Sequence, residues 1–168
     1  QSPEILRGLE AYNRKDFGTA YRIWLPLAES GDPEAQYRIG RLFSKGDGVE
    51  QDYDRAVKWY SSGANQNHSK SMTGLGVYYY NGWGIDADLD LAYALLNTSR
   101  KMGDPYASNI LAISYEIGRG VEPDGKKALD LHIEAMKLGV CAAANDIALM
   151  YKDPPKGLEP DLSEAYRY

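Results

Sequence analysis

A helix–loop–helix unit at residues 34–63 recurs along this sequence at intervals of 36 residues. Small residues repeat at two positions in the first helix of the unit, and an aspartate repeats where its second helix should start. The three series are Ala35, Ser71, Ala107 and Ala143; Gly40, Gly76, Ala112 and Ala148; and Asp52, Asp88 and Asp124. A fixed period of this length is typical of proteins built from stacked structural repeats.

The period predicts an all-α fold, a solenoid of stacked antiparallel helix pairs. Each helix would span about 10–14 residues, a length that is marginal for an isolated helix in water. Each pair would also leave an apolar face uncovered, so stability should come from packing between neighbouring pairs. We expect one solenoid domain over residues 1–168, with an N-terminal helix pair at 1–31, repeats at 32–67, 68–103 and 104–139, and a partial, degenerate repeat at 140–168.

Local signals within the repeats support this organisation. The Asp–Pro pairs at 32–33 and 104–105 each place a capping side chain before a proline at the first helical position. Three loops carry a Gly-x-Gly motif, and glycine accepts a positive φ at no steric cost. The Gly40 series should lie where two helices cross, since a larger side chain there would force the axes apart. Pro26 is expected to kink the second helix or to end it early.

The charge of the chain restricts the kinds of partner it can have. The formal net charge is −5 and the isoelectric point is about 5.1. This argues against nucleic acid, whose phosphates need a basic surface, and against an anionic membrane surface. No run of 18 apolar residues is present, so we expect no membrane insertion. We expect the chain, which starts at Gln1 and not at Met, to be a processed or shortened form, with further residues after Tyr168.

Residues that could support catalysis or metal binding are few and scattered. His68 lies at a repeat boundary and should be exposed, whereas His132 lies in a series of helix-packing positions and should be a packed polar residue. Cys141, the single cysteine, should be a small buried side chain. Residues 86–90 resemble the start of a calcium loop but lack its central glycine and final glutamate. We therefore expect no catalytic residues, no metal, no cofactor and no small-molecule substrate.

One repeat, residues 32–67, carries the fullest set of pattern residues: Ala35, Ile39, Gly40, Gly46, Gly48, Val49, Asp52, Ala56, Trp59 and Tyr60. This pattern resembles the Sel-like repeat family, whose helix pairs are related to the tetratricopeptide repeat. The chain departs from it in the longer loop at 152–157 and at Leu95 and Leu96, which replace the Trp–Tyr pair. The resemblance implies a right-handed α/α superhelix that binds other proteins. It also implies that bacterial members are often exported, as envelope scaffolds, host-interaction adaptors or immunity proteins.

By analogy with tetratricopeptide repeats, the first helix of each pair should line a concave face that binds a partner protein. The inward positions include residue types that dominate protein interfaces. Trp83, between two loop glycines, either folds back on Tyr79 or Tyr80 or contacts a partner. The candidate partner-binding residues are Tyr37, Arg41, Val77, Tyr80, Trp83, Tyr106, Asn109, Ile113 and Glu116. The alternative is that the tyrosines simply pack between neighbouring repeats.

These observations favour a non-enzymatic protein–protein interaction module. The resemblance points to a bacterial protein in the periplasm or another exported location, with the cytoplasm as the alternative. Within this class we expect an immunity protein that neutralises a secreted toxin or effector, and an envelope or secretion-complex scaffold or adaptor is the alternative. From another class, the chain could be an enzyme or the regulatory module of one, which would need a pocket with a strongly perturbed acid, base or histidine.

Overall fold

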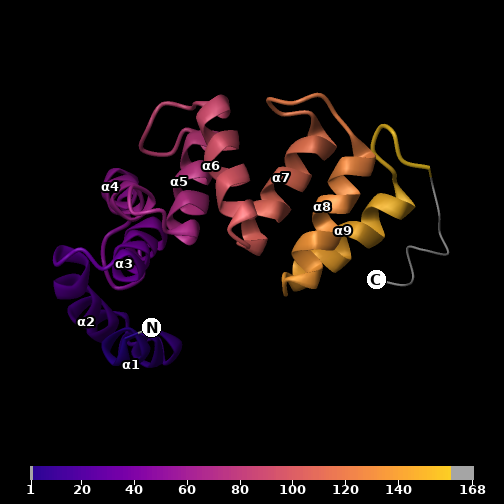
Figure 1. The fold of residues 1–168 in the computed structure, drawn as a ribbon. Helices are drawn as coiled ribbons and strands as arrows, with labels where there is room; N and C mark the ends of the chain where they lie inside the picture. The colour runs from indigo at the N-terminus through magenta and orange to yellow at the C-terminus, as the bar shows by residue number, and fades with distance from the viewer. Residues whose placement is uncertain (1, 160–168) are drawn as a thin grey trace. The chain divides into compact units, whose positions relative to one another are not determined.

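The computed structural model describes residues 2–159, and the chain in this range is built from helices joined by short loops (Figure 1). The helices are α1 (Pro3–Asn13), α2 (Phe17–Glu29), α3 (Pro33–Lys45), α4 (Tyr53–Ala64), α5 (Ser69–Asn81), α6 (Leu89–Lys101), α7 (Pro105–Ile117), α8 (Gly125–Lys137) and α9 (Cys141–Lys152). No strand occurs among the described residues. The all-α fold class expected from the period is confirmed.

The loops between paired helices repeat the same backbone geometry. Gly46, Gly82 and Gly118 end α3, α5 and α7 in the left-handed conformation, with φ of 75°, 73° and 69°. Each loop then closes through the amide of the periodic aspartate, which donates to a carbonyl nine residues earlier in the chain. The three hydrogen bonds are Asp52 to Phe43 at 2.9 Å, Asp88 to Tyr79 at 3.0 Å and Asp124 to Tyr115 at 3.0 Å. The periodic glycines and aspartates therefore fix the loop shape.

Several helices begin at the expected capping residues, and α2 does not end early at its internal proline. Ser2 and Asp32 accept hydrogen bonds from the amides of Ile5 and Ala35, at 3.3 Å and 2.8 Å. These bonds satisfy amides that have no partner inside the helix. Pro26 was expected to kink helix α2 or to end it early; the early end is wrong, because the helix continues to Glu29, and the kink stays a prediction. A proline near the C-terminal end of a helix removes only one backbone bond, and packing against the neighbouring helices outweighs that loss.

The helices form two compact units, with the boundary in the sequence between Asp88 and Leu89. In the N-terminal unit each helix from α1 to α5 packs on the next, and α3 also contacts α5. In the C-terminal unit α6, α7, α8 and α9 pack in the same consecutive way. Stacking in sequence order is the arrangement expected of a helical solenoid. The expectation of a single domain over the whole chain stays a prediction.

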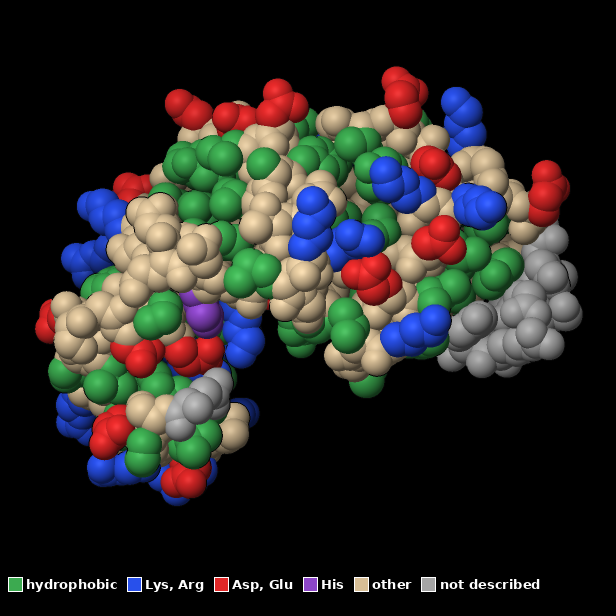
Figure 2. All heavy atoms as spheres, viewed as in Figure 1, with side chains coloured by type: hydrophobic (Ala, Val, Ile, Leu, Met, Phe, Trp, Pro, Cys, Tyr) green, Lys and Arg blue, Asp and Glu red, His purple; other side chains and the backbone are tan. Residues whose placement is uncertain are grey.

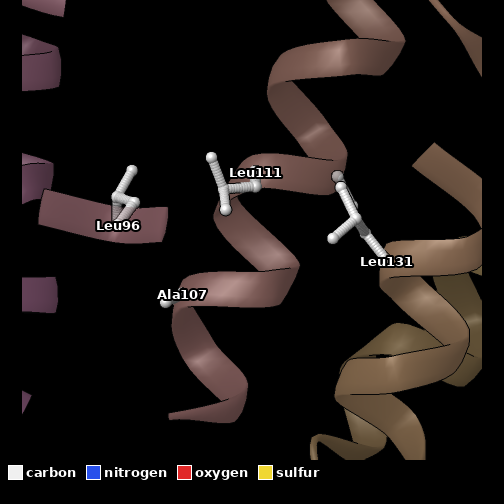
Figure 3. Packing of buried hydrophobic residues seen from close by; sticks show 5 residues of the cluster. Leu96, Ala107, Leu111 and Leu131 are labelled. Carbon is white, nitrogen blue, oxygen red and sulfur yellow. The ribbon is translucent and has the colours of Figure 1, made fainter. Parts of the chain in front are cut away.

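The core of each unit lies between consecutive helices. In the C-terminal unit Leu96 of α6, Leu111 of α7 and Leu131 of α8 form one apolar cluster with Ala107 (Figure 3). All four are buried. In the N-terminal unit the buried Trp24 of α2 donates from Nε1 to the carbonyl of Ile5 at 3.3 Å. An indole buried in this way keeps its polar group satisfied.

Gly40 of α3 shows why small residues recur in the first helices. A Cβ atom at this position would lie 2.8 Å from Cε1 of the Tyr60 ring on α4. Contacts between carbon atoms this short are strongly repulsive, so any side chain at Gly40 would displace α4 or the ring. The close helix crossing expected at this series is therefore present in the N-terminal unit.

Candidate functional site

Arg41 of α3 lies between two tyrosine rings in the N-terminal unit. Its guanidinium carbon is 5.7 Å from the centre of the Tyr12 ring on α1 and 5.8 Å from that of Tyr37. The Nζ atom of Lys70 on α5 lies 5.8 Å from the Tyr37 ring centre. These distances are within the range of cation–π attraction. We call these four residues the cationic–aromatic surface; it holds two cations and two partly exposed rings in fixed positions.

Tyr12 belongs to this surface but was missed in the sequence. Its hydroxyl donates to Oδ2 of Asp47 in the loop after α3, at 2.7 Å. Burial and this hydrogen bond raise the pKa of Tyr12. The period could not place Tyr12 because the first helix pair lacks a Gly-x-Gly loop, so α1 falls out of register with the later first helices.

Next to this surface, Glu34 of α3 is surrounded by basic groups. It forms an ion pair with Arg38, lies 3.2 Å from Nε2 of His68 and lies 3.6 Å from Nζ of Lys70. Burial alone would raise the pKa of Glu34, but the hydrogen bond with His68 and the charges of Arg38 and Lys70 outweigh it and hold the pKa at about 2. His68 is therefore a largely buried link between α3 and α5, with 17% of its side chain exposed, and the expectation of an exposed histidine is wrong.

The same histidine forms a serine–histidine–carboxylate series that the sequence did not indicate. Nδ1 of His68 lies 2.9 Å from Oγ of Ser71, and Nε2 lies 3.2 Å from Oε2 of Glu34. A catalytic serine must expose its hydroxyl to a substrate. Ser71 is fully buried, and a Cβ built on Gly63 would lie only 2.2 Å from its Oγ atom. The series therefore joins helices and offers no accessible nucleophile.

Three further candidate residues of the N-terminal unit differ in exposure. Trp83 folds back onto the protein, as one of the two alternatives expected, but it contacts other rings than those predicted. It stacks on Tyr53 and meets Tyr78 edge-on, each at 5.7 Å between ring centres. It remains 42% exposed. Val77 is half-buried, and Tyr80 is buried. Of the three, Trp83 has the most surface to offer a partner.

In the C-terminal unit several exposed apolar side chains lie on α7 and one lies on α9. Tyr106 is 64% exposed and Ile113 is 38% exposed, and both were candidate contacts. Ile117 at the end of α7 and Leu149 of α9 are also exposed but were not among the candidates. Leu149 lies in the same repeat series as Arg41 and Ile113, so the period contained a signal for it. Ile117 precedes the loop glycine, where the other repeats carry Lys45 and Asn81.

His132 of α8 lies at the centre of a polar cluster in this unit. It is fully buried, as expected of a packed polar residue. Nδ1 lies 3.0 Å from Oδ1 of Asn109 on α7 and 3.9 Å from Oδ2 of Asp146 on α9, and Nε2 lies 2.8 Å from Oε1 of Glu116 on α7. One imidazole thus lies against side chains of both neighbouring helices and hydrogen-bonds the partly exposed carboxylate of Glu116. Asn109 and Glu116, both candidate contacts with a partner, thus lie within hydrogen-bond distance of the His132 imidazole.

The remaining chemistry-bearing groups do not form a reactive site in residues 2–159. Cys141 at the start of α9 is exposed, so the expectation of a buried side chain is wrong. It is the first residue of the helix, and its Sγ atom lies 3.9 Å from the carbonyl oxygen of Gly139. Within the same range, no three His, Cys, Asp or Glu side chains are grouped so that they could hold a metal ion. None of the described helices has the length and apolar content needed to span a bilayer.

The comparison with known families decides the class of the repeat. The family model of the Sel1 repeat matches residues 33–68, 69–104, 105–140 and 141–168. The chain belongs to the Sel1 repeat family. Each matched repeat starts one residue later than the repeat boundaries proposed from the sequence. Sel1 repeats are generally protein-interaction modules, so the resemblance to Sel-like repeats and the general class of function are both confirmed.

Solved structures of bacterial Sel1 repeat proteins share the fold. A Sel1 repeat protein from Oxalobacter formigenes is 30% identical with a TM-score of 0.81, over 98% of this chain and 69% of that one. A protective antigen of uropathogenic Escherichia coli is 23% identical with a TM-score of 0.75, over 96% of this chain and 35% of that one. A Sel1 repeat protein from Klebsiella pneumoniae is 18% identical with a TM-score of 0.72, over 98% of this chain and 81% of that one. No curated protein matches the sequence.

The candidate contacts divide between the two units of this Sel1 repeat protein. The N-terminal unit contains Tyr37, Arg41, Val77, Tyr80 and Trp83, and the C-terminal unit contains Tyr106, Asn109, Ile113 and Glu116. On the face seen in Figure 2, hydrophobic side chains lie between acidic and basic ones over both units. Partner binding by these nine residues stays a prediction.

Proposed function

We propose that this chain is a bacterial protein-binding module whose role is to hold one partner protein and not to catalyse a reaction. The observation that carries the proposal is the solvent-exposed apolar face of α7, formed by Tyr106, Ile113 and Ile117. Large apolar side chains grouped on a soluble surface usually mark an interaction site. The cationic–aromatic surface adds the residue types that are enriched at interface hot spots.

Bacterial origin and export are part of the same proposal. All three similar structures reported above are bacterial, and the protein from Escherichia coli is a protective antigen. An antigen that protects has to be reached by the host, which supports an exported location for that protein. We extend this to the present chain and place it in the periplasm or another exported compartment.

The sharper form of the proposal is an immunity protein that neutralises a secreted toxin or effector. Its support is the contrast between a surface of cations and aromatic rings in one unit and apolar and acidic side chains in the other. Several contacts of different chemistry on a small chain favour one specific partner, because few proteins complement all of them at once.

Co-purification of the full chain from its native cell, followed by identification of the bound proteins, tests this function. An immunity protein should bring down one partner tightly, and the isolated partner should be toxic without it. Several envelope proteins bound weakly would instead identify a scaffold or adaptor of the envelope or a secretion complex. Recovery of an enzyme whose activity changes on binding would identify a regulatory module.

A variant pair tests whether the cationic–aromatic surface takes part. Tyr37→Ala combined with Arg41→Ala should weaken binding of the co-purified partner by at least about a hundredfold, because interface tyrosine and arginine residues often contribute about 2 kcal/mol or more each. Arg22→Ala is the matched control, since it removes an exposed arginine from α2 in the same unit. Unchanged affinity in the double variant would exclude this surface. Loss of melting temperature together with affinity would show that the side chains serve the fold.

A further inference from the structure

A cleft of about 600 Å³ opens in the C-terminal unit between the end of α7 and the segment around the end of α9. Its lining residues are Glu116, Asp146, Leu149, Met150, Lys152, Asp153, Pro154 and Pro155. The volume falls within the range of pockets that hold small ligands or a few side chains. The repeat pattern breaks here, because Pro154 and Pro155 stand where the other repeats have a loop glycine.

Part of the cleft wall is apolar and exposed. Leu149 of α9 is 54% exposed, although leucine is usually buried in a folded protein. Ile113 of α7, one helical turn before Glu116, is also exposed but is not one of the lining residues. Pro154 and Pro155 extend this wall beyond α9. Covering these side chains would remove apolar surface from water and so favour a bound partner.

The charged residues of the cleft are mostly acidic. Three of the four are carboxylates, namely Glu116, Asp146 and Asp153, and Lys152 is the one cation among the lining residues. Glu116 accepts a hydrogen bond from the buried His132, and Asp146 lies 3.9 Å from the same imidazole. Both carboxylates keep part of their surface in solvent, with 23% and 31% of their side chains exposed. Fixed carboxylates beside an apolar wall are complementary to a cation next to an apolar side chain.

We infer that this cleft binds a short basic and apolar segment of the partner protein. An aliphatic or aromatic side chain of the segment covers Leu149, and a neighbouring lysine or arginine pairs with Asp153 and with Glu116, the carboxylate that His132 hydrogen-bonds. The inference rests on the proposed protein-binding function and adds the chemistry of the bound segment. Nucleic acid does not fit, because its phosphates would face carboxylates.

Binding of short synthetic peptides to the full chain tests the inference by isothermal titration. The probe peptide carries lysines and arginines around a leucine and a phenylalanine. One matched peptide replaces the basic residues with glutamate, and a second replaces the two apolar residues with serine. We expect the probe to bind at least about tenfold more tightly than either matched peptide, and added salt to weaken it. Equal binding of the basic and acidic peptides would overturn the inference.

Variants of the exposed cleft residues locate the binding. Leu149→Ser and Asp153→Asn together should lower the affinity for the probe by about tenfold or more. Neither residue is buried, so the fold should persist, and a circular dichroism melt checks this. Leu138→Ser is the matched control, because Leu138 is an exposed leucine outside the cleft, at the end of α8. An unchanged affinity in the double variant, or an equal loss in the control, would contradict the assignment.

The outcomes separate this inference from the proposed function. If the co-purified partner binds the Leu149→Ser and Asp153→Asn variant as tightly as the parent, protein binding stands and the cleft assignment fails. If no partner is recovered but the probe peptide binds as expected, the cleft assignment stands and the proposed function fails. A dimer of the chain that the same two substitutions dissociate would assign the cleft to a second copy and overturn the inference.

Discussion

Tyr60 in the N-terminal unit and His132 in the C-terminal unit occupy equivalent positions two repeats apart, yet their surroundings differ completely. Tyr60 is buried against the rings of Tyr37 and Tyr78, with ring centres 6.1 Å and 5.5 Å away. Burial raises the pKa of its hydroxyl well above the usual value. His132 is buried among an amide and two carboxylates. The same backbone frame thus accepts an aromatic cluster in one unit and a polar cluster in the other.

The neighbours of these two residues change together. Tyr60 contacts Tyr37, Ser44 and Gly74, and the positions 72 residues later are Asn109, Glu116 and Asp146, which surround His132. The repeat therefore fixes which positions face one another but not the residue types found there. A single polar side chain placed in the aromatic cluster would be buried without a hydrogen-bond partner. The polar side chains around His132 avoid this cost because they hydrogen-bond with one another.

At a second set of equivalent positions the polar residues lie in the N-terminal unit and the uncharged ones lie in the C-terminal unit. The N-terminal unit has the charged cluster of Glu34, Arg38, His68 and Lys70. The positions 72 residues later are Tyr106, Ile110, Val140 and Ala142, none of which carries a charge. At these positions the charged side chains of one unit are thus replaced by uncharged ones in the other. The exchange contributes to the difference between the two surfaces, cationic and aromatic in one unit, apolar and acidic in the other.

The largest effect is expected from filling the space that the aromatic cluster requires. Gly40→Leu should lower the free energy of unfolding by about 3 kcal/mol or more, because even a Cβ atom would lie 2.8 Å from the Tyr60 ring. Denaturant unfolding monitored by circular dichroism measures this change. The equivalent residue of the C-terminal unit is Ala112, so Ala112→Gly is the matched control and should cost only about 1 kcal/mol from helix propensity. A Gly40→Leu variant that unfolds like the parent would show that α3 and α4 can separate freely.

An intermediate effect is expected from removing the centre of the polar cluster. His132→Leu should destabilise the chain by about 2 kcal/mol, because Glu116 and Asn109 lose their hydrogen-bond partner while both stay partly buried. Amide hydrogen exchange should increase in α7, α8 and α9. Tyr60→Phe is the matched change in the N-terminal unit, and it should cost less than about 1 kcal/mol since the ring stays in place. If His132→Leu and Tyr60→Phe lowered the free energy of unfolding equally, a special structural role for the hydrogen bonds of His132 would be contradicted.

The elements of the fold could be predicted because their causes are local. Asp32 and Asp52 cap helices through a side chain only three residues from the amide that they bind. Gly46 ends α3 in a backbone conformation that favours glycine. Such features depend on short stretches of chain and recur with the period. The early end at Pro26 was wrong because the continuation of α2 depends on packing against its neighbours.

The site was harder to predict because exposure depends on contacts between repeats. His68 was placed in solvent, but it reaches back 34 residues to Glu34. Trp83 stacks on Tyr53, which lies 30 residues earlier, and of the tyrosines in α5 it meets Tyr78, which was not the expected contact. A period shows which positions are equivalent but not which side chain reaches into the next repeat. Pairing across repeats follows from the stacking distance, which the sequence does not contain.

The smallest effect, and the one that depends on pH, should come from Glu34. Its pKa is about 2 in the folded chain against an ordinary value of 4.5, so its contribution to stability is complete above pH 4.5 and is lost as the pH falls towards 2. Glu34→Gln should therefore lower the free energy of unfolding by on the order of 1 kcal/mol at neutral pH. Denaturant unfolding over a pH series should show the two proteins converging in acid.

Tyr106→Gln is the control for Glu34→Gln, since Tyr106 occupies the equivalent position in the C-terminal unit and has 64% of its surface in solvent. Its effect should be below about 0.5 kcal/mol and independent of pH, because exposed substitutions rarely change stability by more. If Glu34→Gln also gives a difference that stays constant between neutral and acidic pH, the carboxylate is not held by its basic neighbours. The exchange of charged and uncharged side chains between the units would then affect their surfaces without affecting their stability.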